Sequence, residues 1–165
     1  MKGGRTVTQI YGTENKIEQV IVTYADMIYR IAFQNVKNKS DAEDIFQDVC
    51  ITLISKNPPL DDEAHLKNWL VRVTINKCKN FHKSVWRKRT ESLDDHTDLF
   101  APEHQTVLEE IFRLPENYRN AIYLHYYESF TINEIAEIMN KNPNTVSSYL
   151  VRGRKKLKDF LLECD

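Results

Sequence analysis

The chain of 165 residues carries 23 Lys and Arg against 24 Asp and Glu, so its formal net charge is −1. A hydrophobic fraction of 41% and only four glycines favour folded helical material over disorder, and the length allows one ordinary domain or two small ones. The three scattered cysteines argue against a disulfide framework, and no apolar run approaches the ~18 residues of a membrane span. We therefore expect a cytoplasmic protein without membrane insertion.

The chain begins with a polar N-terminus, residues 1–14, which we expect to be flexible. From Asn15 an apolar stripe at helical spacing predicts the first helix. Ser40 is the predicted N-cap of the next helix, with Glu43 completing a capping box. The second helix should end at Asn57, because two prolines follow. Its inward positions are apolar, whereas its other face carries Asp41, Asp44, Gln47 and Asp48.

A third helix is predicted from about Asp61 to Trp86. Its second half is basic and aromatic, since residues 72–89 contain seven Lys or Arg and no acid. Positively charged side chains can hold the phosphate backbone of single-stranded nucleic acid while its bases stack on neighbouring aromatic rings. Asn76 and Asn80 lie four residues apart and so share one face of this helix. The alternative is a solvated helix whose aromatics belong to the core. Charge repulsion within so dense a cluster argues against it.

The charge then reverses. Residues 90–112 contain seven acids and no Lys or Arg, and the poorly periodic part of this stretch, residues 90–104, predicts an acidic linker. Helical patterns resume at Thr106, and Leu114-Pro115 opens a further helix. No strand-like alternation of useful length appears. The predicted fold is all-α: two small helical domains, residues 15–89 and 105–165, joined by the linker.

The C-terminal domain contains a predicted helix-turn-helix. Thr131 and Glu134 form a capping box, Asn140 begins a polar turn, and Asn142 caps a helix whose first residue is Pro143. Such a corner presents its second helix to the DNA major groove. The outward positions of that helix are Asn144, Thr145, Ser147, Ser148 and Arg152, followed by Arg154, Lys155, Lys156 and Lys158, which suit phosphate contact. An ordinary helical hairpin with a solvated basic end is the alternative.

Catalytic chemistry finds no support in the sequence. It contains no glycine-rich phosphate loop, no Gly-x-Ser-x-Gly and no set of histidines at metal-ligand spacing. Cys78 and His82 lie four apart, but no second pair accompanies them. We expect nothing to bury the carboxylates at residues 41–48 or to raise their pKa in a pocket, and charge alone favours simple solubilisation. We expect no enzyme, no metal and no cofactor.

The order of these features resembles the extracytoplasmic-function (ECF) sigma factors of the sigma-70 family. Residues 40–49 read S-D-A-E-D-I-F-Q-D-V and are similar to a signature of that family. Leu114-Pro115-x-x-Tyr118-Arg119 is similar to a second one, as is I-A-E-I-M at 135–139 leading to N-T-V-x-S at 144–148. These matches fall in both halves and in the family's order, over roughly residues 15–90 and 105–160.

The resemblance implies a role for each surface. Asp41, Asp44, Gln47 and Asp48 would bind the β′ clamp helices of core RNA polymerase. The −10 promoter element would contact Pro59, Leu60, Asp61, Asn76, Lys77, Asn80, Lys83 and Arg87, with the loop around Pro59 capturing a flipped base. The −35 element would contact Asn144, Thr145, Ser147, Ser148, Tyr149, Arg152, Arg154 and Lys155. The implied partners are core polymerase (β′ and β), promoter DNA and an anti-sigma factor.

Three positions depart from the family pattern. Asn140 stands where glycine is usual, although Asn also tolerates a left-handed turn. Ser147 and Tyr149 replace positions often held by Lys and Arg, which predicts weaker electrostatic binding to the −35 element. Two other functions stay open: a stand-alone helix-turn-helix transcriptional regulator, and an N-terminal half that is purely a protein-interaction module.

Overall fold

A computed structural model describes the backbone of residues 7–91 and 107–163, with side chains for 15–85 and 110–162. The described residues form seven α-helices and no strand, which confirms the predicted all-α class. The chain divides into two compact units, Met1–Glu91 and Ser92–Asp165. Residues 1–6 of the predicted N-terminus and all but the first two residues of the predicted linker lie outside the described residues. None of the described helices combines the length and apolar character that crossing a bilayer requires.

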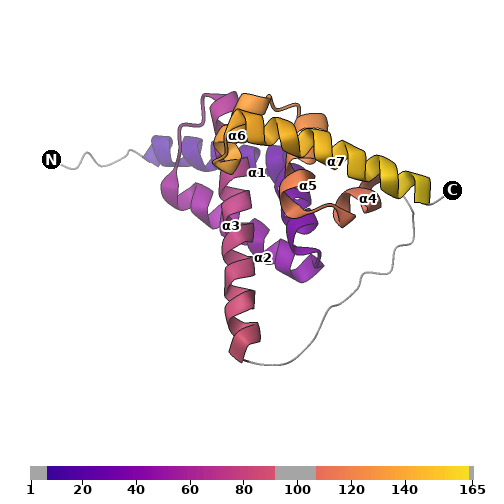
Figure 1. The fold of residues 1–165 in the computed structure, drawn as a ribbon. Helices are drawn as coiled ribbons and strands as arrows, with labels where there is room; N and C mark the ends of the chain where they lie inside the picture. Colours follow the sequence, from indigo (N-terminus) through magenta and orange to yellow (C-terminus); the bar gives the residue numbers. More distant parts are fainter. Residues whose placement is uncertain (1–6, 92–106, 164–165) are drawn as a thin grey trace. The chain divides into compact units, whose positions relative to one another are not determined.

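The first unit is a bundle of three helices, α1 (Val7–Val36), α2 (Lys39–Lys56) and α3 (Glu63–Glu91), each packed against the other two. The last turns of α3 extend beyond its two neighbours (Figure 1). Each helix contributes apolar side chains that are almost completely buried: Ile28 and Ile31 from α1, Val49 and Leu53 from α2, Leu70 and Ile75 from α3. Their burial supplies the main driving force for this unit.

Two helix starts differ from the prediction. The N-cap of α2 is Asn38 and not Ser40: its backbone is extended, and its side-chain oxygen accepts the Asp41 N–H at 3.1 Å. A capping residue needs this extended backbone, whereas Ser40 already lies inside the helix. In addition, α1 begins at Val7 instead of Asn15. Val7, Ile10 and Tyr11 have helical spacing, a pattern that the polar neighbours obscured.

The second unit comprises α4 (Val107–Arg113), α5 (Glu116–Tyr126), α6 (Ile132–Met139) and α7 (Pro143–Glu163). Helix α7 packs against the other three (Figure 1). Leu124, Ile135 and Val146 form the centre of its core. The backbone of Gly153 lies so close to α5 that an added Cβ would come within 2.7 Å of Ile122 Cδ1. The missing side chain therefore permits the close approach of α7 to α5.

The helix-turn-helix has the predicted local structure. Thr131 and Glu134 form both hydrogen bonds of the capping box. The side-chain oxygen of Asn142 accepts the Asn144 N–H at 2.8 Å, and Pro143 is the first residue of α7. Asn140 is left-handed, with φ 52° and ψ 53°, and its N–H closes the end of α6. These contacts fix the angle between α6 and α7.

The turn gives a first testable prediction. Asn140→Ala should lower the free energy of unfolding by about 1 kcal/mol, because alanine tolerates a positive φ less well than asparagine. Asn140→Gly should stay within about 0.5 kcal/mol of the parent, since glycine adopts this backbone freely. Urea denaturation followed by circular dichroism measures both. Equal stability of the two variants would show that the left-handed turn imposes no cost.

Candidate protein and nucleic-acid interfaces

The acidic face of α2 is exposed where the sequence predicts it. Ala42, Ile45, Val49 and Leu53 turn inward, and Asp44, Gln47 and Asp48 turn to solvent. The expectation that burial raises no carboxylate pKa on this face is wrong for Asp41, which is half-buried: its pKa is raised, first by burial and second by the nearby Asp44 carboxylate. Asp41 is therefore less available to a partner than the other three.

Two exposed isoleucines extend this face and were not predicted. Ile51 and Ile54 are 62% and 58% exposed. They follow Gln47 by four and seven residues, so they share its side of the helix. The same spacing was visible in the sequence, where both were overlooked because isoleucine is usually buried. An apolar pair beside exposed acids and an amide is typical of a protein-contact surface.

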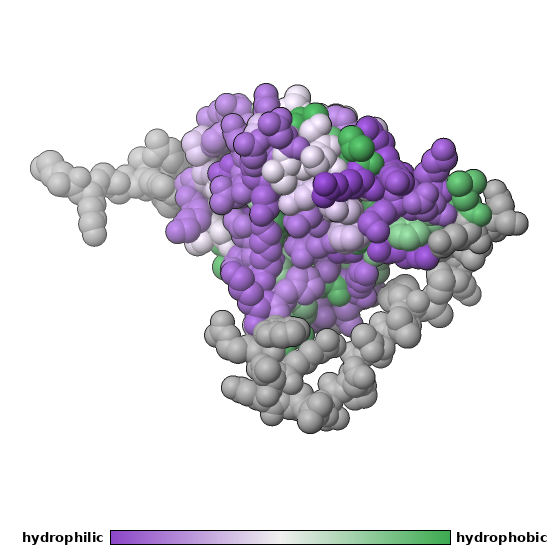
Figure 2. Space-filling model, viewed as in Figure 1, coloured by the Kyte–Doolittle hydropathy of each residue, from purple (hydrophilic) through white to green (hydrophobic). Residues whose placement is uncertain are grey.

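Helix α3 presents a polar face that includes most of the predicted nucleic-acid contacts. Asn76, Asn80 and Lys83 are exposed, and the side chain of Arg87 lies outside the described residues. Lys77 is more enclosed: its side chain is 33% exposed, and its Nζ lies 4.0 Å from Asp48 Oδ2 on α2. Hydrophilic side chains cover most of the surface visible along α3 (Figure 2).

A groove of about 330 Å³ separates this face from the acidic face of α2. Its lining comes from both helices: Asp44, Ile45 and Asp48 from α2, and Lys77, Asn80, Phe81 and Ser84 from α3. The structure thus places residues predicted to bind polymerase directly beside residues predicted to bind DNA. The sequence predicted two separate surfaces and gave no sign that the two sets of residues lie side by side.

The loop between α2 and α3 contains the other predicted −10 residues. Asn57 ends α2 in a left-handed conformation, and the Asp62 carboxylate accepts the His65 N–H at 3.0 Å to begin α3. Between them, Pro59 and Asp61 are exposed and Leu60 is half-buried. Lys16 of α1 pairs with Asp61 at 3.2 Å, but both side chains are largely exposed, so this pair contributes little to stability.

Helix α7 exposes most of its predicted contacts. Asn144, Ser147, Ser148, Arg152, Arg154 and Lys155 face solvent, and Thr145 is half-buried. Tyr149 is also half-buried, because its ring packs against Tyr118 of α5 at 5.5 Å between centroids. Val151, in contrast to Tyr149, is 55% exposed. It lies three and four residues after Ser148 and Ser147, a position suited to contact a thymine methyl group, and it was missing from the prediction.

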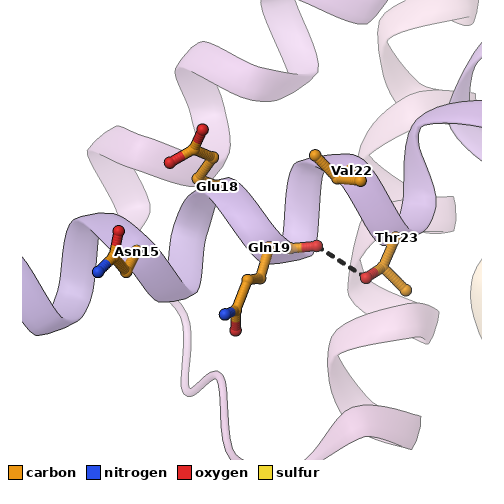
Figure 3. A pocket seen from close by; sticks show the side chains of 5 residues that line it. All are labelled: Asn15, Glu18, Gln19, Val22 and Thr23. Atoms are coloured by element: carbon orange, nitrogen blue, oxygen red, sulfur yellow. Dashed lines mark hydrogen bonds between the residues drawn. The ribbon is translucent and has the colours of Figure 1, made fainter.

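The first unit has two further features, the Cys78–His82 pair and a hollow on α1. Cys78 is completely buried, and His82 Nε2 lies 3.0 Å from the Asn35 carbonyl oxygen. Both side chains therefore take part in the packing of the first unit. In the described part of the chain, no three potential metal-ligating side chains gather. A hollow on the outer side of α1 is lined by Asn15, Glu18, Gln19, Val22 and Thr23 (Figure 3). It offers one carboxylate and no cation.

Comparison with known proteins identifies the family. Residues 20–88 match Sigma-70 region 2, and residues 104–157 match Sigma-70 region 4. The chain belongs to the sigma-70 family of RNA polymerase sigma factors, in its ECF group, and the resemblance expected from the sequence is confirmed. A stand-alone helix-turn-helix regulator is not favoured, because the match also covers the N-terminal half.

Individual relatives agree with this assignment. The RNA polymerase sigma factor SigV of Bacillus subtilis is 28% identical over 152 residues, which cover 88% of this chain and 90% of SigV. SigZ of the same organism is 30% identical over 138 residues, which cover 78% of this chain and 77% of SigZ. Among solved structures, the sigma factor RpoE of Bartonella quintana in complex with the anti-sigma factor NepR has a TM-score of 0.74 at 20% identity, covering 87% of this chain and 95% of RpoE. That last likeness shows the shared fold.

Proposed function

We propose that this chain directs core RNA polymerase to specific promoters and assists promoter melting, without catalysing a reaction itself. The observation that carries the proposal is the presence of both sigma-70 regions in one chain, each with its own exposed polar side chains. Binding energy from two DNA elements and from the polymerase would then favour strand opening. Its site of action would be the cytoplasm, and we expect it to need no cofactor.

The polymerase would bind the outward face of α2. Asp44, Gln47 and Asp48 would contact the β′ clamp helices, with Asp41 at the edge of the contact. Ile51 and Ile54 would add apolar area beside these polar groups, as in other protein interfaces. Five exposed side chains lie on the same side of α2 and form a single continuous surface: Asp44, Gln47, Asp48, Ile51 and Ile54.

The −10 element would lie along α3 and the loop before it. Asn76 and Asn80 would contact unpaired bases, since amides match base edges. Lys77, Lys83 and Arg87 would neutralise phosphates. The exposed loop with Pro59, Leu60 and Asp61 would capture a base flipped out of the stack. These residues belong to the proposed sigma region 2, residues 15–89. The acidic linker that follows, residues 90–104, would enter the basic channel of the polymerase.

The −35 element would be bound in duplex form by region 4, residues 105–165. Asn144, Ser147 and Ser148 would contact base edges in the major groove, with Thr145 beside them. Arg152, Arg154 and Lys155 would bind phosphates. Tyr149 would support the helix through its packing on Tyr118 instead of contacting DNA. The β subunit would be the neighbouring polymerase surface, and an anti-sigma factor, as in the RpoE–NepR complex, would hold the protein inactive.

Transcription in vitro tests the proposal as a whole. Purified core RNA polymerase, the full chain and a library of promoter fragments should give promoter-dependent transcripts that disappear when the chain is left out. A gel shift without polymerase should show weak binding, because each unit is small and the net charge is −1. Tight, two-fold-symmetric binding without polymerase would favour a conventional regulator and contradict the proposal.

One substitution tests the role of α7. Arg152→Ala should weaken binding to a promoter duplex about tenfold, because Arg152 is exposed on the proposed DNA face and arginine binds guanine or phosphate strongly. The measurement is fluorescence anisotropy with a promoter identified in the transcription assay and with a scrambled duplex. A loss restricted to the promoter indicates base recognition. An equal loss on both duplexes would reduce Arg152 to a phosphate contact.

A further inference from the structure

A hydrogen bond connects the proposed DNA-binding helix α7 to the last residue of α5. Arg154 Nη1 on α7 donates to the phenol oxygen of Tyr126 at 2.7 Å, between residues 28 apart. Both residues are exposed, and Tyr126 is 51% accessible to solvent. Within the described residues, no other basic side chain of α7 forms a hydrogen bond or ion pair with another element. Among the described basic residues of α7, Arg154 is thus the one whose side chain is held by a residue of another helix.

The tyrosine that accepts this hydrogen bond is itself held in place. The ring of His125 meets the ring of Tyr126 edge-on, at 4.9 Å and 80°. His125 Nδ1 lies 2.9 Å from the carbonyl oxygen of Phe130, which can only accept, so this nitrogen must carry the proton. Phe130 is buried in the core of the unit. A chain of contacts therefore runs from the core to the phenol and on to Arg154.

The chemistry of the pair preserves the positive charge of Arg154. A phenol oxygen is a neutral acceptor, whereas the carboxylate of Asp48 opposes the charge of Lys77 in the first unit. The guanidinium has five N–H donors, and most of them stay available to an anion. A long arginine side chain also loses conformational entropy when it is fixed on binding. Fixing it beforehand reduces that cost, and so strengthens binding.

The position of Arg154 suits a phosphate contact. It follows Ser147 by seven residues, which is about two helical turns, so both lie on nearly the same side of α7. We propose that Tyr126 is a positioning residue, which holds Arg154 toward a DNA phosphate beside the bases contacted by α7. The proposal rests on the proposed function of region 4. It adds a residue from outside the helix-turn-helix to the machinery of duplex binding.

Tyr126→Phe tests the proposal, because it removes only the hydroxyl and keeps the ring. The full-length parent, Tyr126→Phe, Arg154→Ala and the double variant are titrated against the promoter duplex from the transcription assay, at several salt concentrations. Tyr126→Phe should weaken binding about threefold, as expected for one lost hydrogen bond. Arg154→Ala should weaken it more and reduce the slope of log K against log salt by about 1, the value for one phosphate contact. In the Arg154→Ala background, Tyr126→Phe should have no further effect.

The four proteins distinguish the possible results. An equal effect of Tyr126→Phe in both backgrounds would mean that the phenol contacts DNA or supports the fold, and would overturn the proposal. So would unchanged binding by Tyr126→Phe in the parent background. Thermal denaturation should give the same Tm for the parent and Tyr126→Phe, because the hydroxyl is exposed. If Arg152→Ala weakens promoter binding while Tyr126→Phe does not, only the role of Tyr126 fails. If the parent itself does not bind the promoter, the proposed function fails with it.

Discussion

Replacing Arg119 by methionine should lower the free energy of unfolding of the C-terminal unit by about 3 kcal/mol. Arg119 is 4% exposed, and its guanidinium donates from Nη1 to the carbonyl oxygens of Phe112 and Leu114, both at 3.0 Å. The Phe112 carbonyl lies in the last turn of α4 and the Leu114 carbonyl lies just beyond it, where a helix supplies few N–H donors of its own. Methionine fills a similar volume but donates no hydrogen bond, so two carbonyls would lose a partner. For a unit of this size the Tm should fall by more than about 10 °C.

Circular dichroism at 222 nm on the full chain measures this effect. Arg152→Ala is the matched control, since it removes an exposed arginine from the same unit and should leave the Tm unchanged. Promoter-dependent transcription should fall with Arg119→Met at temperatures above the new transition, because α7 packs against α4 and α5. A Tm equal to that of the parent would contradict a structural role for the buried guanidinium.

The double substitution Gln47→Ala and Asp48→Ala should reduce the affinity for core RNA polymerase at least tenfold, a loss of about 1.4 kcal/mol or more. Both side chains are exposed on the outward face of α2, where neither contributes to the core. Their loss should therefore leave the fold intact and remove two polar contacts from the proposed interface. Titration of core polymerase against the labelled full chain measures the change.

A second double variant provides the control. Glu18→Ala with Gln19→Ala also removes one carboxylate and one amide, from the exposed hollow on α1 (Figure 3). It should bind polymerase like the parent. The same loss in both double variants would indicate a general effect of charge, and an unchanged affinity of the α2 variant would exclude this face as the polymerase contact. Ile51→Ser then asks whether the apolar extension contributes to the same contact.

The helix-turn-helix shows why local structure was predictable from the sequence. The capping box at Thr131 and Glu134, the left-handed Asn140 and Pro143 at the start of α7 depend on hydrogen bonds and backbone preferences within a few residues. Where two caps competed locally, the prediction failed. Asn38 and Ser40 are both good N-caps, and the backbone conformation at Asn38 selected the first.

The site residues were less completely predictable. Exposure of Asp44, Gln47 and Asp48 followed from the helical periodicity of their apolar neighbours. The half-buried position of Tyr149 did not, because it depends on Tyr118, which lies 31 residues earlier on another helix. The exposed Ile51, Ile54 and Val151 were overlooked for a related reason. Apolar residues are assigned to the core by default, and only packed helices reveal which of them remain outside.

The sequence by itself determined that this protein is all-α and belongs to the ECF sigma factors. Helical periodicity, caps and family motifs are written in residues close along the chain, so they need no knowledge of packing. Tertiary structure alone brought Asp48 beside Lys77, Tyr149 against Tyr118 and Tyr126 to Arg154. Each of these contacts joins different helices, and the distances between them depend on how side chains interlock in the core, down to the missing side chain of Gly153.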